Sequence, residues 1–145
     1  MIYNTNLQPL PTNADELERC LADPIWRIFS GCLYKIKIKG DDFRDEYGVL
    51  QIADTFELPF KPNDAQIKFL DRLWYRNIIL KARQLGFTTL ICVLWLDHAL
   101  FNANQNCGII AQDLPTVYNI FKDKIKFAYD NLPPEIRERF PLKTC

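Results

Sequence analysis

The feature that most constrains the fold is a pair of short apolar runs, each of which leads into a helix-forming segment. Residues 78–80 are followed by a turn at 84–86 and by residues 88–100, which are too apolar and too numerous for a strand and predict a largely buried helix. Residues 107–111 lead in the same way to a helix that begins at Leu114. Strands and helices that alternate with short connections imply parallel strands joined by right-handed crossovers. The sequence therefore predicts a core of the α/β class.

Residues 1–58 show a less regular pattern and predict a helical and extended subdomain ahead of that core. Polar residues of the kind that cap helices precede each helix expected before residue 75. The expected elements are a helix after Thr12 or Asn13, a short helix at 25–29, a half-exposed strand at 33–39 with 49–56 as its candidate partner, and a helix that begins after Asn63 or Asp64 and reaches Trp74.

Charge is segregated along the chain, although the net charge of its 145 residues is zero. Residues 40–57 hold six acids and one base, a net charge of −5, and residues 60–89 hold six bases and two acids, a net charge of +4. Pro59 and Pro62 mark the boundary between the two blocks. The chain lacks the overall basic charge that is typical of nucleic-acid-binding domains, and a solvated helix face explains most of the basic block without DNA contact.

The composition argues against several other classes of protein. The longest apolar run, residues 90–96, is much shorter than the roughly 20 residues of a membrane span, and the N-terminus lacks a secretory signal pattern. The five cysteines include no C-x-x-C pair, which argues against a zinc or thioredoxin-like site. Cys32, Cys92 and Cys107 stand among apolar neighbours and are expected to be buried thiols. His98 has no partner for metal binding or catalysis and is expected to be structural or exposed.

Residues 81–89, with the sequence KARQLGFTT, join the first predicted strand to its helix and occupy the place of a phosphate-binding loop. In the common form of that loop, G-x-x-x-x-G-K-[ST], Gly86 and Thr88 match the last glycine and the Mg²⁺-binding hydroxyl. Lys81 then stands at the first glycine, and Phe87 stands at the lysine. Backbone N–H groups at a helix start bind phosphate whichever side chains surround them. The alternative interpretation is an ordinary turn from strand to helix with two exposed bases.

Two further features of the sequence favour a nucleotide site: basic side chains that can replace the missing loop lysine, and an upstream glutamine that can recognise the base. Lys81 and Arg83 flank the turn, and either of them can fold over a phosphate. Gln66 follows a proline-containing entry at 60–65 and offers one amide donor and one acceptor, the pair that can read the edge of adenine. Considered alone, a glutamine on a helix is usually a surface residue. Its position ahead of a phosphate loop favours a nucleotide-binding function.

Two runs of the sequence closely resemble the N-terminal part of the large terminase subunit of tailed bacteriophages and prophages, the ATP-driven motor that packages DNA. The runs are PFKPNDAQIKFLDRLWYRNIILKARQLGFTTL and CGIIAQDLPTVYNIFKDKIKFAYDNLPPEIRERF, within residues 59–140. The resemblance implies that residues 59–145 are the first part of a helicase-like P-loop ATPase with a three-layer α/β/α core, containing its strands 1 and 2. It implies ATP and Mg²⁺ as cofactors, with Thr88 on the metal. The implied nucleotide contacts are Gln66, Lys81, Arg83, Gln84, Gly86, Phe87, Thr88 and Thr89.

The resemblance also implies partners and a place of action. The full motor acts on double-stranded DNA in the bacterial host cytoplasm, works with a small terminase subunit and the portal protein of the procapsid, and is compatible with a ring of identical subunits. No membrane partner is implied.

The chain departs from the family after the second expected strand. Such motors need a third strand that ends in an acidic pair, and then a nuclease domain, and neither is found in these residues. Asp113 follows an apolar run but precedes Leu-Pro-Thr, so it is expected to cap a helix. We therefore expect a truncated front part of a terminase that hydrolyses no ATP alone. Two alternatives remain: a fragment of another helicase-like DNA-dependent ATPase, and a non-enzymatic domain that binds DNA or protein.

Overall fold

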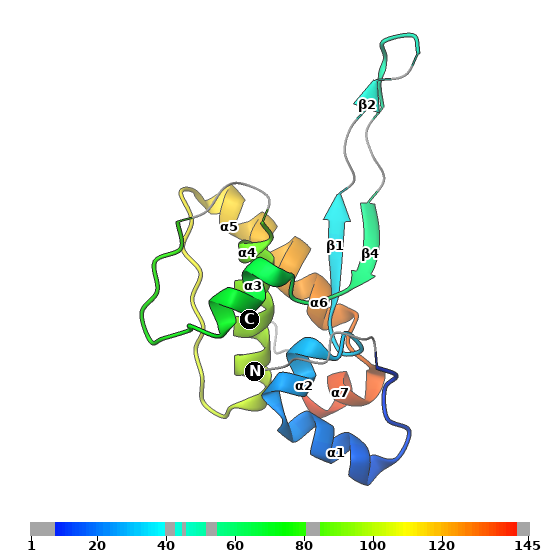
Figure 1. The fold of residues 1–145 in the computed structure, drawn as a ribbon, viewed down its shortest axis with the longest axis vertical. Coiled ribbons are helices and arrows are strands. Elements are labelled where there is room, and N and C mark those ends of the chain that lie inside the picture. The colour runs from blue at the N-terminus through cyan, green and yellow to red at the C-terminus, as the bar shows by residue number, and fades with distance from the viewer. Residues whose placement is uncertain (1–7, 40–42, 45, 52–54, 81–84, 142–145) are drawn as a thin grey trace.

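A computed structural model describes residues 8–39, 43–44, 46–51, 55–80 and 85–141 of the chain. The described elements form a helical body and a strand hairpin that projects from it (Figure 1). In chain order they are α1 (Ala14–Ala22), α2 (Pro24–Phe29), β1 (Lys35–Lys39), β2 (Phe43–Arg44), β3 (Leu50–Gln51), β4 (Thr55–Pro59), α3 (Asp64–Leu70), α4 (Phe87–Phe101), α5 (Leu114–Ile120), the π-helical turn η1 (Phe121–Lys126), α6 (Phe127–Asp130) and α7 (Pro134–Arg139).

The predicted starts of α1, α2 and α3 are confirmed, because each depends on a short-range capping hydrogen bond. Asn13 caps α1 by accepting from the backbone N–H of Asp15, and Asp23 caps α2 through Ile25. Asn63 caps α3, although that helix ends at Leu70 and does not reach Trp74. The helix predicted at 88–100 is α4, and α7 is a helix that the sequence did not predict.

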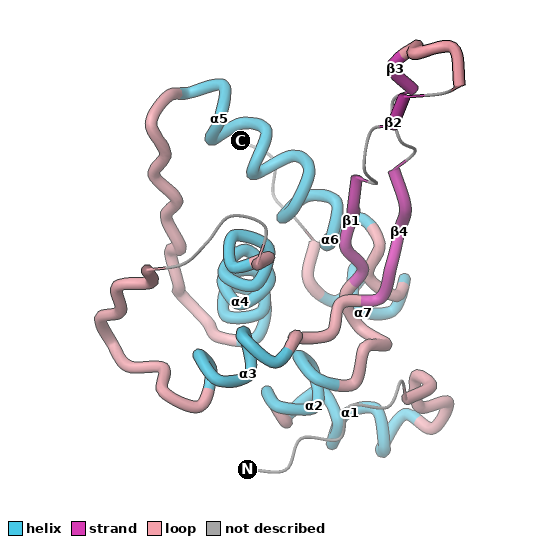
Figure 2. The backbone as a smooth tube through the Cα atoms, turned by 45° about the horizontal axis from the view of Figure 1, so that its top comes forward, coloured by secondary structure: helices cyan, strands magenta, loops and turns pink. Residues whose placement is uncertain are grey.

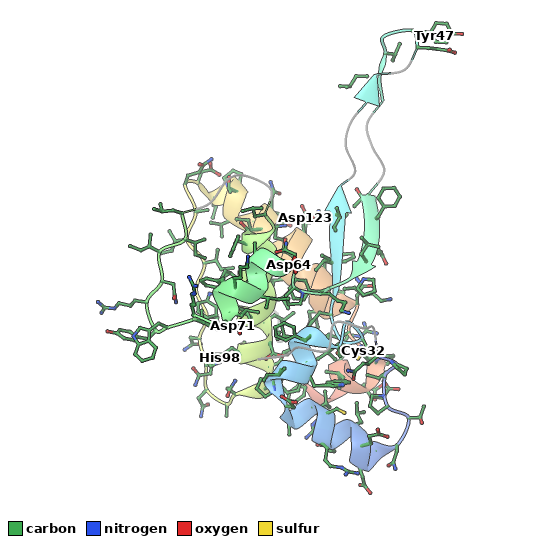
Figure 3. All side chains as sticks on the ribbon, viewed as in Figure 1. Cys32, Tyr47, Asp64, Asp71, His98 and Asp123 are labelled. Atoms are coloured by element: carbon green, nitrogen blue, oxygen red, sulfur yellow. The ribbon has the colours of Figure 1, made fainter. Side chains whose placement is uncertain are left out.

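The projecting hairpin consists of β1 and β4, with β2 and β3 further out, and we call the described residues from 35 to 59 the hairpin arm (Figure 1). β1 and β4 are antiparallel, with Lys35 opposite Pro59 and Lys39 opposite Thr55. This pairing confirms the predicted strand and assigns its main partner to 55–59, later than the expected 49–56. Tyr47 lies at the far end of the arm and is 83% exposed (Figure 3).

One hydrophobic core runs through the helical body, and α4 lies at its centre (Figure 2). Core side chains such as Leu33 and Tyr34 come from the first 58 residues, whereas Leu90 and Ile136 come from the later part of the chain. The two segments therefore pack into a shared core across the boundary that the sequence predicts at residue 58. Arg27 of α2 and Asp97 of α4 add a buried ion pair between them.

The two runs predicted as buried parallel strands are not strands within the described residues. Residues 78–80 and 107–111 are non-helical and belong to no ladder. Ile79 and Ile109 are half-buried, but Ile78 and Ile110 are 92% and 97% exposed. A strand needs backbone partners at its edges as well as apolar cover. The body covers one side of these runs, and the described residues provide no neighbouring strand. The parallel core that the sequence predicts is therefore not formed in the described part of the chain.

None of the described helices combines the length and the apolar character needed to cross a bilayer.

Candidate functional site

Three lysines from distant parts of the sequence line a cavity of about 410 Å³ beside the start of α4, which we call the lysine pocket. They are Lys37 of β1, Lys61 of the segment that enters α3, and Lys124 of η1. The cavity is large enough for a small charged ligand. Among the described residues that line it, no acid balances the three charges. The other lining residues are Ile36, Ile38, Phe60, Asn63, Gln66, Leu85, Gly86 and Thr89.

The start of α4 lies at this pocket, because Gly86 and Thr89 are among its lining residues. Gly86 is the N-cap, with a left-handed backbone at φ 70°, and no side chain of the described residues caps the helix. The first intrahelical bond runs from Leu90 N–H to the Gly86 carbonyl, so the N–H groups before Leu90 precede the helical ladder. The positive end of the macrodipole of a 15-residue helix lies at the same place. Uncapped donors and a positive helix end favour an anion here.

Gln66 joins α3 to the turn in front of α4. Its side chain is 4% exposed, and its Oε1 accepts from the backbone N–H of Asn63 at 2.9 Å. Its Nε2 donates to the carbonyls of Gly86 at 2.9 Å and Leu85 at 3.4 Å. The amide that the sequence assigns to adenine is therefore engaged within the fold, and base recognition by Gln66 stays a prediction that requires these bonds to exchange.

Thr89 and Thr88 face different cavities. Thr89 lines the lysine pocket, and its Oγ1 accepts a 2.9 Å hydrogen bond from Nζ of Lys124. Thr88 lines a separate cavity of about 280 Å³ whose other walls are mostly apolar, among them Ile91 and Ile109. The described residues offer no carboxylate beside Thr88, so these surroundings do not fit hydrated Mg²⁺. Metal binding by Thr88 stays a prediction from the sequence.

The predicted loop residues divide into two groups. Gly86, Phe87, Thr88 and Thr89 are described, whereas Lys81, Arg83 and Gln84 lie outside the described residues. The pocket lysines were not identified as site residues from the sequence. Only Lys61, near the proline-marked boundary, gave a signal, as part of the basic block. Lys37 and Lys124 belong to segments whose closeness to Gly86 depends on the tertiary fold.

Asp113 caps a helix and His98 is exposed, as the sequence predicts. Asp113 caps α5 by accepting from the backbone N–H of Thr116 at 2.7 Å, and hydrogen bonding to Thr116 lowers the pKa of the Asp113 carboxyl. His98 is exposed, with Nε2 at 3.2 Å from the side-chain oxygen of Gln105. Within the described ranges, no group of three or more His, Cys, Asp or Glu residues is placed to hold a metal ion.

The prediction of buried thiols holds for only one of the three cysteines. Cys92 is buried in α4, and burial raises the pKa of its thiol. Cys32 is half-buried, and Cys107 is exposed because residues 107–111 do not form a buried strand. The four cysteines that the structure describes carry free thiols.

Comparisons of this chain with protein-family models, with curated proteins and with solved structures found no match.

Proposed function

We propose that this chain binds the phosphate chain of ATP in the lysine pocket, as the nucleotide-binding front part of a phage DNA-packaging motor. The observation that carries the proposal is the convergence of Lys37, Lys61 and Lys124 on the uncapped start of α4, with no acid among the described lining residues. The sequence pattern of the variant phosphate loop and the resemblance to large terminases supply the rest of the argument.

The chemistry of the pocket suits a polyanion. Ammonium groups form charge-assisted hydrogen bonds to phosphate oxygens, and the backbone N–H groups at a helix start add neutral donors. Three lysines and two residues from the start of α4, Gly86 and Thr89, line one cavity of about 410 Å³. The three lysines repel one another in the pocket. A bound phosphate chain would offset this repulsion, because each lysine would then lie near a negative charge.

The wider function follows from the same proposal. In the full motor, ATP hydrolysis would drive double-stranded DNA into the procapsid in the bacterial host cytoplasm, with the small terminase subunit and the portal protein as partners. Hydrolysis in such motors needs an acid that polarises the attacking water, and no acid is among the described residues that line the lysine pocket, so we expect this site to bind ATP without hydrolysing it. ATP turnover by this chain at a rate abolished by Thr88→Ala would refute that expectation.

Isothermal titration calorimetry of the whole chain with ATP tests the proposal. Lys61→Met removes one pocket charge and should weaken binding about tenfold, the value of one charge-assisted hydrogen bond. Lys68→Met provides the control, because Lys68 is an exposed lysine of α3 outside the pocket lining. Lys81→Ala and Arg83→Ala test the predicted loop cations in the same assay. Absence of ATP binding by the wild-type chain would overturn the proposed function.

A second candidate, a non-enzymatic interaction domain, draws on the hairpin arm. The arm projects from the body and exposes Tyr47, Leu50 and Phe56, which are 83%, 54% and 54% exposed (Figures 1 and 3). Exposed apolar side chains on a projecting element favour contact with another macromolecule. Replacement of residues 43–51, the outer part of the arm, by a short turn keeps Lys37 in the lysine pocket. It should abolish binding of such a partner and leave ATP binding unchanged, whereas the nucleotide-site variants should have the reverse effect.

A further inference from the structure

Phe87 stands at the position that carries lysine in the common phosphate loop, and it belongs to the core. Its side chain is 8% exposed, and its ring meets the ring of Phe69 edge to face with centroids 5.6 Å apart. A buried phenyl ring offers no charge to a phosphate group. The cation that normally follows the last glycine of the loop must therefore come from another residue.

Lys124 brings a positive charge to this place from a segment 35 residues beyond Thr89. Its Nζ lies 2.9 Å from Oγ1 of Thr89, and its side chain lines the lysine pocket. Burial raises the pKa of the Cys92 thiol of α4, and the charge of Lys124 opposes that rise. An ammonium group has three donors, so the bond to Thr89 leaves two for oxygen atoms of a ligand.

The local backbone around Lys124 is unusual. Lys124 lies in η1, a π-helical turn placed directly between α5 and α6. Such turns occur mostly as single insertions in α-helices and are frequent at functional sites. Because one residue advances an α-helix by about 100°, an inserted residue changes which side chains face a neighbouring element. Here the π-helical turn carries the lysine that contacts the first turn of α4.

We propose that Lys124 replaces the consensus lysine of the phosphate loop, binding the phosphate chain of the ligand while it remains hydrogen-bonded to Thr89. Ligand binding then fixes η1 against the start of α4. The inference rests on the proposed function, and it adds a residue and a segment that the loop sequence does not contain. Lys61 faces the same ligand from the entry to α3.

Calorimetric titration of the whole chain with ATP, and separately with inorganic tripolyphosphate, tests this role. Lys124→Met should weaken binding of both ligands by about tenfold or more, because the contact is to phosphate. Lys122→Met is the matched control, since Lys122 lies on the same turn, is exposed and does not line the pocket. That variant should change affinity by less than about twofold, because solvent screens its charge. Equal losses in the two variants would contradict a specific role for Lys124.

Thr89→Val separates ligand binding from a structural role. This change removes the hydrogen bond of Lys124 but keeps its charge in the pocket. Thr89 itself lines the pocket, so its change is expected to cost some affinity. If Lys124 binds phosphate, Thr89→Val should lose clearly less affinity than Lys124→Met, because the ammonium group remains. If Lys124 only holds Thr89 in place, the two variants should lose equal affinity, and the proposal is wrong.

The outcomes also separate this inference from the proposed function. Binding of neither ligand by the wild-type chain would overturn both. ATP binding that is weakened by Lys61→Met and unaffected by Lys124→Met would preserve the pocket and overturn the role of Lys124. If Lys124→Met fails to fold, lysine acetylation of the wild-type chain followed by mass spectrometry supplies the result. Saturating tripolyphosphate should then protect Lys124 and leave the acetylation of Lys122 unchanged, and unchanged acetylation of both would contradict the proposal.

Discussion

Arg27 and Asp97, 70 residues apart in the sequence, form a two-pronged ion pair inside the protein, with Nε–Oδ1 at 2.7 Å and Nη2–Oδ2 at 2.8 Å. Nη1 of Arg27 donates to the carbonyl of Leu21, and the hydroxyl of Tyr34 donates to Oδ1 of Asp97. The Arg27 guanidinium also stacks over the ring of Phe101, 4.2 Å from its centroid. This network joins α2, the segment before β1, and α4.

Removal of either partner of this pair should strongly destabilise the protein. Arg27→Met leaves the carboxylate of Asp97 buried without its cation, and Asp97→Leu leaves the guanidinium of Arg27 in the same condition. Each change should lower the free energy of unfolding by about 3–5 kcal/mol. Urea denaturation followed by circular dichroism measures both effects.

The double variant Arg27→Met/Asp97→Leu should lose clearly less than the sum of the single variants, because no buried charge is then left without a partner. Arg139 and Glu18 form an exposed pair between α7 and α1 and serve as the control. Arg139→Met should cost less than about 1 kcal/mol, since solvent weakens such pairs. If the double variant loses the full sum of the two single losses, an unpaired buried charge is not the cause of the destabilisation.

Gly86 should tolerate substitution poorly for two separable reasons. Its φ of 70° lies in the left-handed region, which costs other residues roughly 1–2 kcal/mol. A Cβ at Gly86 would also lie 2.9 Å from Nε2 of Gln66. Gly48 has a similar φ of 77° with no atom within 4 Å of an added Cβ. Gly86→Ala should therefore destabilise the protein more than Gly48→Ala in thermal unfolding, and equal losses would show that Gln66 accommodates the methyl group.

Tyr34 should make the protein less stable at alkaline pH. Burial raises the pKa of its hydroxyl well above the ordinary value, the charge of Asp97 and the hydrogen bond to it raise the pKa further, and Arg27 opposes them. In the unfolded chain tyrosine ionises near pH ~10, so above that pH the unfolded state binds fewer protons than the native state. The stabilisation from Tyr34 is thus complete below about pH 10 and decreases as pH rises toward the folded-state pKa.

Urea denaturation of the wild-type chain and Tyr34→Phe, between about pH 8 and pH 11, measures this effect. The advantage of the wild-type chain over Tyr34→Phe should shrink above about pH 10, because phenylalanine does not ionise. Other tyrosines and lysines titrate equally in both proteins and cancel from the difference. A difference that stays constant over this range would contradict the prediction.

Ile78 and Ile110 should contribute to self-association more than to stability. They are 92% and 97% exposed in runs that pair with no strand among the described residues, a combination that favours aggregation through strand pairing. Ile78→Lys and Ile110→Lys should reduce light scattering and change the free energy of unfolding by less than about 0.5 kcal/mol. Ile79→Lys is the control, because Ile79 is half-buried and packs against the core, and it should destabilise the protein. Unchanged scattering in the first two variants would show that these runs do not mediate association.

The sequence predicted those parts of the fold that depend on neighbouring residues. Asn13, Asp23, Asn63 and Asp113 each cap the helix that they precede, because the capping hydrogen bond spans only two or three residues. The alternation of apolar and basic residues likewise predicted β1 correctly. The start of α4 was located as well, and with it the glycine and Thr89 of the candidate site.

The tertiary structure decided the features that depend on contacts between distant segments of the chain. The runs at 78–80 and 107–111 have the composition of buried strands, but a strand exists only where another segment meets its backbone groups. The lysine pocket likewise depends on Lys37, Lys61 and Lys124, which no local rule brings together. Thr88 and Thr89 are adjacent in the sequence, yet they face different cavities because successive helical residues point in directions about 100° apart. The sequence by itself thus determined where the capped helices begin, and only the packing of distant segments decided which charges line the cavity at the start of α4.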